Sequence, residues 1–484
     1  MLKGSVRTSA EPARASDPRP AGRFRSAAAF YLLTGLALWS LYLAVHDWHP
    51  ACPDDCGSYI VLLWHRPWEA NFWHIFATTY RRYMTVPLVF SFFGAPPAAF
   101  DRIAFFQTLV SFAAWTLLAA AASSLLPSRA ARRVVFLLLA VGMFSRGYFW
   151  YDGVIVSDSL AWSLVLVWIA ATLRYDLLRR TRLRLVGPRW PLEAPLYLAL
   201  TVATAAARDA NAFLLVASLP LLLPSLFERR ISWRQALTMC LAVLVSFALV
   251  VRASRQRNAV DMADIVAGVV FQRPGALAYF VSHGMPAPSA PERYRLLGPH
   301  DSLRGIVDDR HFVLGDFASM RHAVLTGIPG FLAGGARMVY ARWLLGHPSY
   351  VLHNVVASWD VMFEQWAGER ARGLDYDGRR QLAPFAVWFD WLSTAKMLVL
   401  AGLLILLSVF GRGEGWRLVA AGAALVLSGF SNAVLGFHGD VWELSEMARH
   451  CWIGNLTLHL GLALVVIGSF DRLWRRARGA PTAR

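Results

Sequence analysis

ALTMCLAVLVSFALVVRAS, residues 236–254, is a run of nineteen residues with a single charged side chain, Arg252. A helix needs about 20 predominantly apolar residues to cross the hydrocarbon core of a bilayer. The sequence therefore predicts an all-α polytopic membrane protein with about ten transmembrane helices. The apolar runs that carry this prediction lie at residues 27–45, 103–123, 134–150, 158–174, 193–208, 211–227, 236–254, 387–410, 417–436 and 451–470.

The amino-acid composition also indicates a membrane protein. Of the 484 residues, 56% are apolar and 16% are charged, whereas soluble domains carry roughly 25% charged residues. The net charge of +17 comes mostly from arginine, and much of it lies in the short connections after the second, fourth, sixth and eighth runs and beyond the tenth. This distribution follows the positive-inside rule and does not form a nucleic-acid-binding face. It predicts that both termini lie in the cytoplasm and that nucleic acid is not a partner.

The predicted topology divides the chain into five parts. No small-residue cleavage site follows the first apolar run, so we expect a retained helix there and not a removed signal peptide. Residues 1–26 form a basic, disordered cytoplasmic tail, and residues 27–254 hold helices one to seven, including an outer loop at 46–102. A long extracytoplasmic region follows at 255–386. The last three helices lie at 387–470, and a basic cytoplasmic tail lies at 471–484.

Both extracytoplasmic regions contain segments with a predictable structure. The aromatic stretch at 59–76 is too polar to span the membrane but apolar enough to form helices in the interface, with tryptophan at headgroup depth. Residues 323–345 include Gly327, Pro329 and Gly334. Because glycine and proline interrupt helices, this segment is predicted to be a broken or re-entrant helix and not an eleventh span.

A pair of carboxylates, Asp54 and Asp55, follows the first apolar run in the stretch CPDDCGSY at 52–59. A carboxylate beside hydrocarbon is costly unless it is paired, so these acids are the leading candidates for a catalytic base. A turn built on Asp54 after Pro53 is the structural alternative. For the flanking Cys52 and Cys56, a disulfide and two free thiols are equally open.

Other polar residues gather at the predicted outer ends of the helices. Each group has a structural alternative: helix capping for Ser157-Asp158, a local ion pair for Arg208-Asp209, and snorkelling to lipid headgroups for Arg449-His450. Their common location favours a substrate-binding role. The candidates are Arg82, Asp158, Arg208, Asp209, Asn211, His438, Asp440, Arg449 and His450.

Acids and arginines at an outward-facing site indicate a particular substrate. Arginine binds a lipid phosphate through paired hydrogen bonds, and a carboxylate can deprotonate an attacking hydroxyl. Outside the cytoplasm there is no pool of nucleotide sugars, so the expected donor is a polyprenyl-phosphate sugar anchored among the membrane lipids. The acceptor would be a glycan, lipid or protein of the cell envelope.

The layout resembles the GT-C superfamily of membrane glycosyltransferases, which includes protein O-mannosyltransferases and the bacterial aminoarabinose transferase for lipid A. The residues that carry the resemblance are Asp54-Asp55, Tyr59 and the aromatic stretch, with Ser157–Leu160, Arg208–Asn211, and Gly439-Asp440 with Arg449-His450. The resemblance implies a GT-C-like fold, an inverting mechanism with Asp55 as base assisted by Asp54, and a bacterial cytoplasmic membrane. The long region at 255–386 departs from the pattern and leaves the acceptor open.

Two other functions stay open. A flippase or transporter of lipid-linked saccharides would need polar residues at the membrane midplane, and a polysaccharide polymerase would need the early aspartates less. No cofactor and no metal site are predicted. Two adjacent acids fall short of the shell that a hard cation needs, so a divalent cation at Asp54-Asp55 is left open.

Overall fold

The computed structural model describes the chain over residues 21–45, 50, 61–78, 85–126, 128–144, 155, 157–175, 193–227, 231–253, 262, 265–287, 329–364, 393–409, 416–439 and 444–478. Within these residues the chain forms helices and turns, and no β-strand occurs. The predicted all-α class is therefore confirmed for the described part of the chain. The tail at 1–20 and most of the outer loop between 46 and 60 lie outside it.

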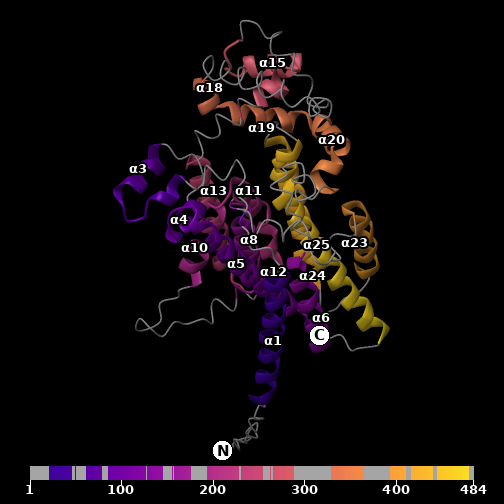
Figure 1. The fold of residues 1–484 in the computed structure, drawn as a ribbon. Coiled ribbons are helices and arrows are strands. Elements are labelled where there is room, and N and C mark those ends of the chain that lie inside the picture. The colour runs from indigo at the N-terminus through magenta and orange to yellow at the C-terminus, as the bar shows by residue number, and fades with distance from the viewer. Residues whose placement is uncertain are drawn as a thin grey trace, which may run out of the picture.

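Each predicted apolar run overlaps a helix or a bent pair of helices in the described part of the chain. Together these helices form the bundle at the centre of the molecule (Figure 1). The helices are α1 (Ala21–Val45), α5 (Ala98–Ser123), α6 (Arg129–Ala140), α8 (Asp158–Leu173), α10 (Glu193–Ala205), α11 (Asp209–Ala217) with α12 (Leu223–Phe227), α13 (Trp233–Ala253), α23 (Thr394–Val409), α24 (Trp416–Gly439) and α25 (Leu444–Ala477).

The helices differ in whether they are long enough to cross a bilayer. Four described stretches are both long and apolar enough: α5, α13, α24 and the His450–Arg475 part of α25. A fifth span results if α11 and the segment Leu219–Phe227 count together, although they bend by 46°. Pro220, which cannot donate a backbone hydrogen bond, lies at this bend. The structure thus shows helices suited to a membrane, while the total of about ten spans stays a prediction.

Several predicted spans are shorter as helices than as apolar runs. For example, α8 has 16 residues, and at 1.5 Å per residue it falls short of the roughly 30 Å of a hydrocarbon core. The helix α6 begins at Arg129, before its apolar run, and continues beyond Ala140 as the tighter turn Val141–Phe144. An apolar run therefore locates a helix better than it sets the helix ends.

Glycines make the contact between α24 and α25 unusually close. They recur every seven residues on each helix, which places them on one face. A Cβ atom added at Gly429 would lie 2.3 Å from the backbone nitrogen of Leu458, and one at Gly461 would lie 2.6 Å from the carbonyl oxygen of Gly422. The two backbones therefore touch directly, as in small-residue packing of membrane helices. The glycines are Gly422, Gly429 and Gly436 on α24 and Gly454, Gly461 and Gly468 on α25.

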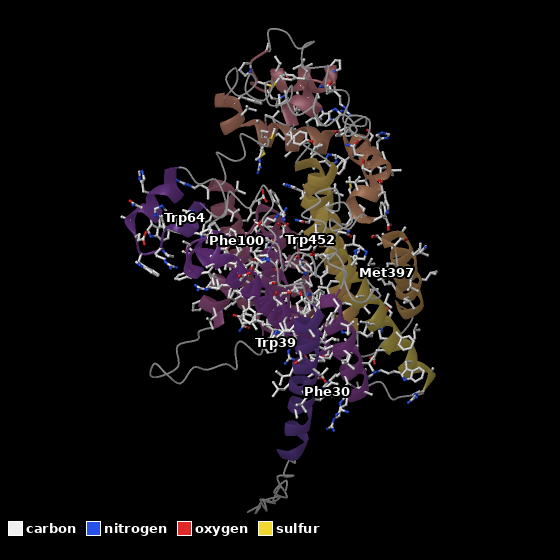
Figure 2. The ribbon with its side chains drawn as sticks, viewed as in Figure 1. Phe30, Trp39, Trp64, Phe100, Met397 and Trp452 are labelled. Carbon is white, nitrogen blue, oxygen red and sulfur yellow. The ribbon has the colours of Figure 1, made fainter. Side chains whose placement is uncertain are left out.

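Tryptophans fill the core of the bundle. Trp162 on α8 packs between Trp115 on α5 and Trp452 on α25, with 6.4 Å between ring centroids in each pair. Figure 2 shows Trp452 among the packed side chains of the bundle. In contrast, α13 leaves Leu241 and Leu249 about half exposed, at 51% and 53%. Apolar side chains that face outward in this way suit contact with lipid.

A separate group of short helices covers one end of the bundle, and we call it the cap (Figure 1). The cap has its own core, in which Phe280, Ala336 and Trp343 are buried. It consists of α15 (Pro274–Ser282), α18 (Pro329–Gly334), α19 (Ala336–Gly346) and α20 (Pro348–Ala357). The chain breaks between α18 and α19 at Gly335, which confirms the predicted broken helix; residues 323–328 lie outside the described residues.

The aromatic stretch after the first helix lies at the flank of the bundle. It forms the turn Val61–Trp64 and the helix α3 (Ala70–Thr78), followed by α4 (Thr85–Phe90). Leu63 and Phe72 are buried, whereas Trp64 and Trp68 are 62% and 71% exposed. Figure 2 shows Trp64 on this flank. A helix in the stretch is thus confirmed, and its depth in a membrane stays a prediction.

The ends of the chain lie far from the cap. The helix α1 begins, and α25 ends, at the end of the molecule opposite α15 and α18 (Figure 1). Because α24 and α25 run antiparallel, the last turn of α24 and the start of α25 point toward the cap. The cap end is therefore where the predicted outer ends of the helices meet.

Candidate functional site

A buried ion pair joins two of the predicted site residues. The Nη1 atom of Arg208 donates a hydrogen bond to Oδ1 of Asp158. Both side chains are buried, with 7% of Arg208 and none of Asp158 exposed. The two residues are 50 positions apart in the sequence, so the contact ties the start of α8 to the start of α11.

Asp209, the residue next to Arg208, hydrogen-bonds to the first turn of its own helix. Oδ1 of Asp209 accepts a hydrogen bond from the backbone N–H of Ala210, at 2.9 Å. Asp209 is the first residue of α11, where a carboxylate interacts favourably with the positive end of the helix dipole. The structure thus pairs Arg208 with Asp158, which is more distant in the sequence than the local partner considered above.

The capping interpretation of Ser157-Asp158 is also revised. Ser157 is the N-cap residue of α8, yet its side chain makes no capping hydrogen bond. Asp158 occupies the first turn of the helix, where its charge is favoured by the helix dipole. Its carboxylate also accepts a hydrogen bond from Arg208, so its role is not limited to stabilising the helix end.

Two asparagines, Asn211 and Asn432, hydrogen-bond to the backbone around the turn between α10 and α11, which contains Arg208. Nδ2 of Asn211 donates to the carbonyl oxygens of Ala161 and Thr204, at 3.1 and 3.0 Å. Nδ2 of Asn432 on α24 donates to the carbonyl oxygen of Ala210, at 2.7 Å. These bonds hold the start of α11 against α8 and α24. Asn211 was predicted from the sequence, whereas Asn432 was missed, although a lone amide within the apolar run 417–436 was the available signal.

His438 links this end of the bundle to the cap. It lies in the last turn of α24 and is 3% exposed, and its ring centroid lies 5.7 Å from that of Tyr350 on α20. His450, on α25, is partly exposed. A Cβ atom at Gly436 would lie 2.6 Å from the carbonyl oxygen of His450, so the two histidines belong to the same end of the α24–α25 pair.

The remaining predicted site residues cannot be placed in this geometry. Asp54, Asp55, Arg82 and Asp440 lie outside the described residues, as do Cys52 and Cys56. Arg449 lies on α25 directly before His450, and its side chain also lies outside the described part. The catalytic roles assigned to the aspartates therefore stay predictions.

A second buried polar group, which was not predicted from the sequence, surrounds His459 in the middle of α25. Nδ1 of His459 lies 2.9 Å from the carbonyl oxygen of Asn455, and Nε2 lies 3.1 Å from Oγ1 of Thr394. Thr394 begins α23, and its backbone N–H donates to Glu364. The signal for this group was a histidine within an apolar run of 20 residues, 451–470.

The described residues contain no group of three or more His, Cys, Asp or Glu side chains placed to hold a metal ion. Cys451 is buried and Cys240 is partly buried, and both thiols are free. Free cysteines in such places act as small apolar packing residues.

Comparisons with known proteins leave the family open. No model of a protein family matches the chain, and no curated protein matches it. The function of this chain is therefore inferred from its own residues.

Proposed function

We propose that this protein is a membrane glycosyltransferase with an extracytoplasmic site. It would transfer a sugar from a polyprenyl-phosphate donor to a glycan, lipid or protein acceptor of the bacterial cell envelope. The proposal includes about ten spans, a GT-C-like arrangement and both termini in the cytoplasm. The position of the cap, opposite the start of α1 and the end of α25, supports this topology because the cap belongs to the region predicted to lie outside.

The buried Arg208–Asp158 pair is the observation that carries the proposal. Burying two charges is expensive, and a buried ion pair often adds no net stability compared with apolar residues of similar size. Charged residues within membrane bundles are mostly functional for this reason. A guanidinium fixed by a carboxylate is oriented before a ligand arrives, which suits the binding of a phosphate at the cap end.

In the proposed reaction, Asp55 takes the proton from the acceptor hydroxyl as its oxygen attacks the anomeric carbon. The bond between that carbon and the phosphate oxygen breaks, and polyprenyl phosphate leaves with the electron pair. Arg208, Arg449 and His450 would stabilise the negative charge that develops on the departing oxygen. Attack from the side opposite the leaving group inverts the anomeric configuration.

Donor binding tests the role of Arg208. Loss of a hydrogen bond to a charged group should weaken binding of a synthetic polyprenyl-phosphate sugar to folded Arg208→Ala protein by about 10- to 100-fold. Arg208→Lys keeps the charge but loses the planar guanidinium, so its donor affinity should lie between that of the parent protein and that of Arg208→Ala. Arg234→Ala, an exposed arginine at the start of α13, is the control and should bind normally. Unaltered affinity in both Arg208 variants would remove this residue from the donor site.

A flippase for lipid-linked saccharides is the second candidate, and the buried His459–Thr394 contact favours it. Transporters place polar residues at membrane depth, and His459 lies well inside α25. Reconstituted vesicles separate the two functions. Transfer of sugar without movement of the donor across the bilayer supports the glycosyltransferase, and movement without transfer supports the flippase.

A further inference from the structure

Four side chains lie near one another where the cap contacts the bundle, and we call them the junction cluster: Arg273, Tyr340, Tyr350 and His438. Tyr340 and Tyr350 both pack on the ring of Trp343, at centroid distances of 6.1 and 4.9 Å. The Cζ atom of Arg273 lies 4.7 Å from the ring centroid of Tyr350, and Tyr350 lies 5.7 Å from His438. Arg273 directly precedes α15, Tyr340 lies on α19, Tyr350 on α20 and His438 on α24. The cluster thus draws on three cap helices and one bundle helix.

Tyr340 is an unusual member of this cluster because its hydroxyl is buried. The residue is 5% exposed, and its hydroxyl makes no hydrogen bond to any residue that the structure describes. Its ring stacks on Trp343 and packs against Phe280, which fixes its position. Buried hydroxyls are nearly always hydrogen-bonded, so such a group needs an explanation.

The electrostatics make the Tyr340 hydroxyl a neutral donor beside a cation. Burial raises the pKa of Tyr340 well above its ordinary value, and the positive charge of Arg273 partly opposes that rise. At physiological pH the hydroxyl therefore carries its proton. A cation and a neutral O–H donor in one place complement an acceptor-rich, negatively charged group.

The members of the cluster differ in exposure. Arg273 and Tyr350 are partly exposed, whereas Tyr340 is buried. The cap lies beyond the end of the bundle and away from its lipid-facing flanks (Figure 1). A ligand that reaches Arg273 would therefore come from water and not from the bilayer.

We propose that the junction cluster binds an oxyanion, a phosphoryl or carboxyl group carried by a water-soluble molecule. Arg273 would supply the charged hydrogen bonds and Tyr340 the neutral one. If the protein is the glycosyltransferase proposed above, this ligand is its acceptor; that assignment rests on the proposed function. Binding itself does not depend on it, since it is measured without donor or transfer.

The structural alternative is that Arg273 only clamps the cap through its contact with Tyr350. Cation–π contacts of this kind stabilise many proteins. In that case the buried hydroxyl of Tyr340 would only lower the stability of the fold. Tyr340→Phe would then raise stability and leave ligand affinity unchanged. The two views therefore make opposite statements about ligand affinity in this variant.

Calorimetric titration of the purified full-length protein decides between them. Glycerol 1-phosphate and glucuronate serve as phosphoryl and carboxyl probes, at constant ionic strength and without lipid donor. We expect saturable binding of at least one probe, and the preferred probe identifies the group. Arg273→Ala should weaken binding about tenfold or more, and Tyr340→Phe about 2- to 10-fold at unchanged or higher thermal stability.

Two controls separate this site from general charge effects and from the donor site. Arg342→Ala removes an exposed arginine from the same helix as Tyr340 and should leave probe affinity unchanged. Arg208→Ala should also leave it unchanged, whatever happens to donor binding. The proposal is overturned if neither probe binds saturably, or if Arg273→Ala or Tyr340→Phe binds the probe as tightly as the parent protein.

Discussion

At the scale of single residues, the contact between Arg208 and Asp158 links stability to function. Each single alanine variant removes the partner that the structure shows for the other buried charge, and breaking a buried ion pair in this way typically costs about 3–5 kcal/mol. Replacing both residues by leucine removes both charges and should restore much of that loss. We therefore expect Asp158→Ala and Arg208→Ala to unfold more easily than the double leucine variant in detergent.

The same double variant distinguishes a structural pair from a functional one. Under the proposed function it should fold and yet fail to bind the polyprenyl-phosphate sugar. A double leucine variant with normal donor affinity would contradict the role of this pair in substrate binding.

Asp55 carries the proposed proton transfer. Removal of a general base typically lowers the rate by about 10²- to 10⁴-fold, so Asp55→Asn should lose nearly all transfer, while Asp54→Asn should lose less. Turnover by purified protein, normalised to folded material, measures this effect. Near-normal turnover of Asp55→Asn would exclude it as the base.

Single residues also mark how far the sequence could predict the site. It indicated that Asp158, Arg208 and Asn211 lie at the same end of the bundle, because alternating helices return there. It could not identify Asp158 as the partner of Arg208, since adjacent Asp209 looked equally suitable. Asn432 and His459 were missed because one polar residue barely changes the hydropathy of a long run.

At the scale of helices, the glycine contact between α24 and α25 should control stability. A methyl group at Gly429 would meet the backbone of α25, which cannot yield as a flexible side chain can. Overpacking of this kind typically costs about 1–3 kcal/mol, and backbone contact places Gly429→Ala at the upper end or beyond. Thermal unfolding in detergent should therefore show a clear loss.

Gly402 provides the matched control for this prediction. It lies on α23, where an added Cβ atom meets nothing within 4 Å. Because alanine is the better helix former, Gly402→Ala should be neutral or more stable by up to about 1 kcal/mol. Equal behaviour of the two variants would show that α24 and α25 do not pack as described.

Helix positions followed from apolar runs, whereas helix lengths and their close packing did not. The bend at Pro220 and the 16 residues of α8 depend on local backbone geometry that hydropathy averages away. The glycine spacing was present in the sequence, at intervals of seven residues in both runs. The spacing predicts close helix packing only when α24 and α25 are known to be neighbours.

At the scale of the whole molecule, the predicted topology places the cap outside and the loop before α13 inside. Both sides can be tested in a variant without native cysteines. Ser282 is exposed on α15, and Ser232 is exposed just before α13. The two test variants are Ser282→Cys and Ser232→Cys. A membrane-impermeant maleimide should label the first in intact cells and the second only after permeabilisation. The reverse pattern would place the candidate site on the cytoplasmic side.

The central claim is glycosyl transfer at the cap end of the bundle, and mass spectrometry of cell-envelope glycans tests it most directly. Cells with and without this protein would be compared, together with cells that carry Asp55→Asn or Arg208→Ala at matched membrane levels. We predict that one sugar modification disappears without the protein, returns with the parent protein and does not return with Asp55→Asn. Identical envelope glycans in all four strains would contradict the claim.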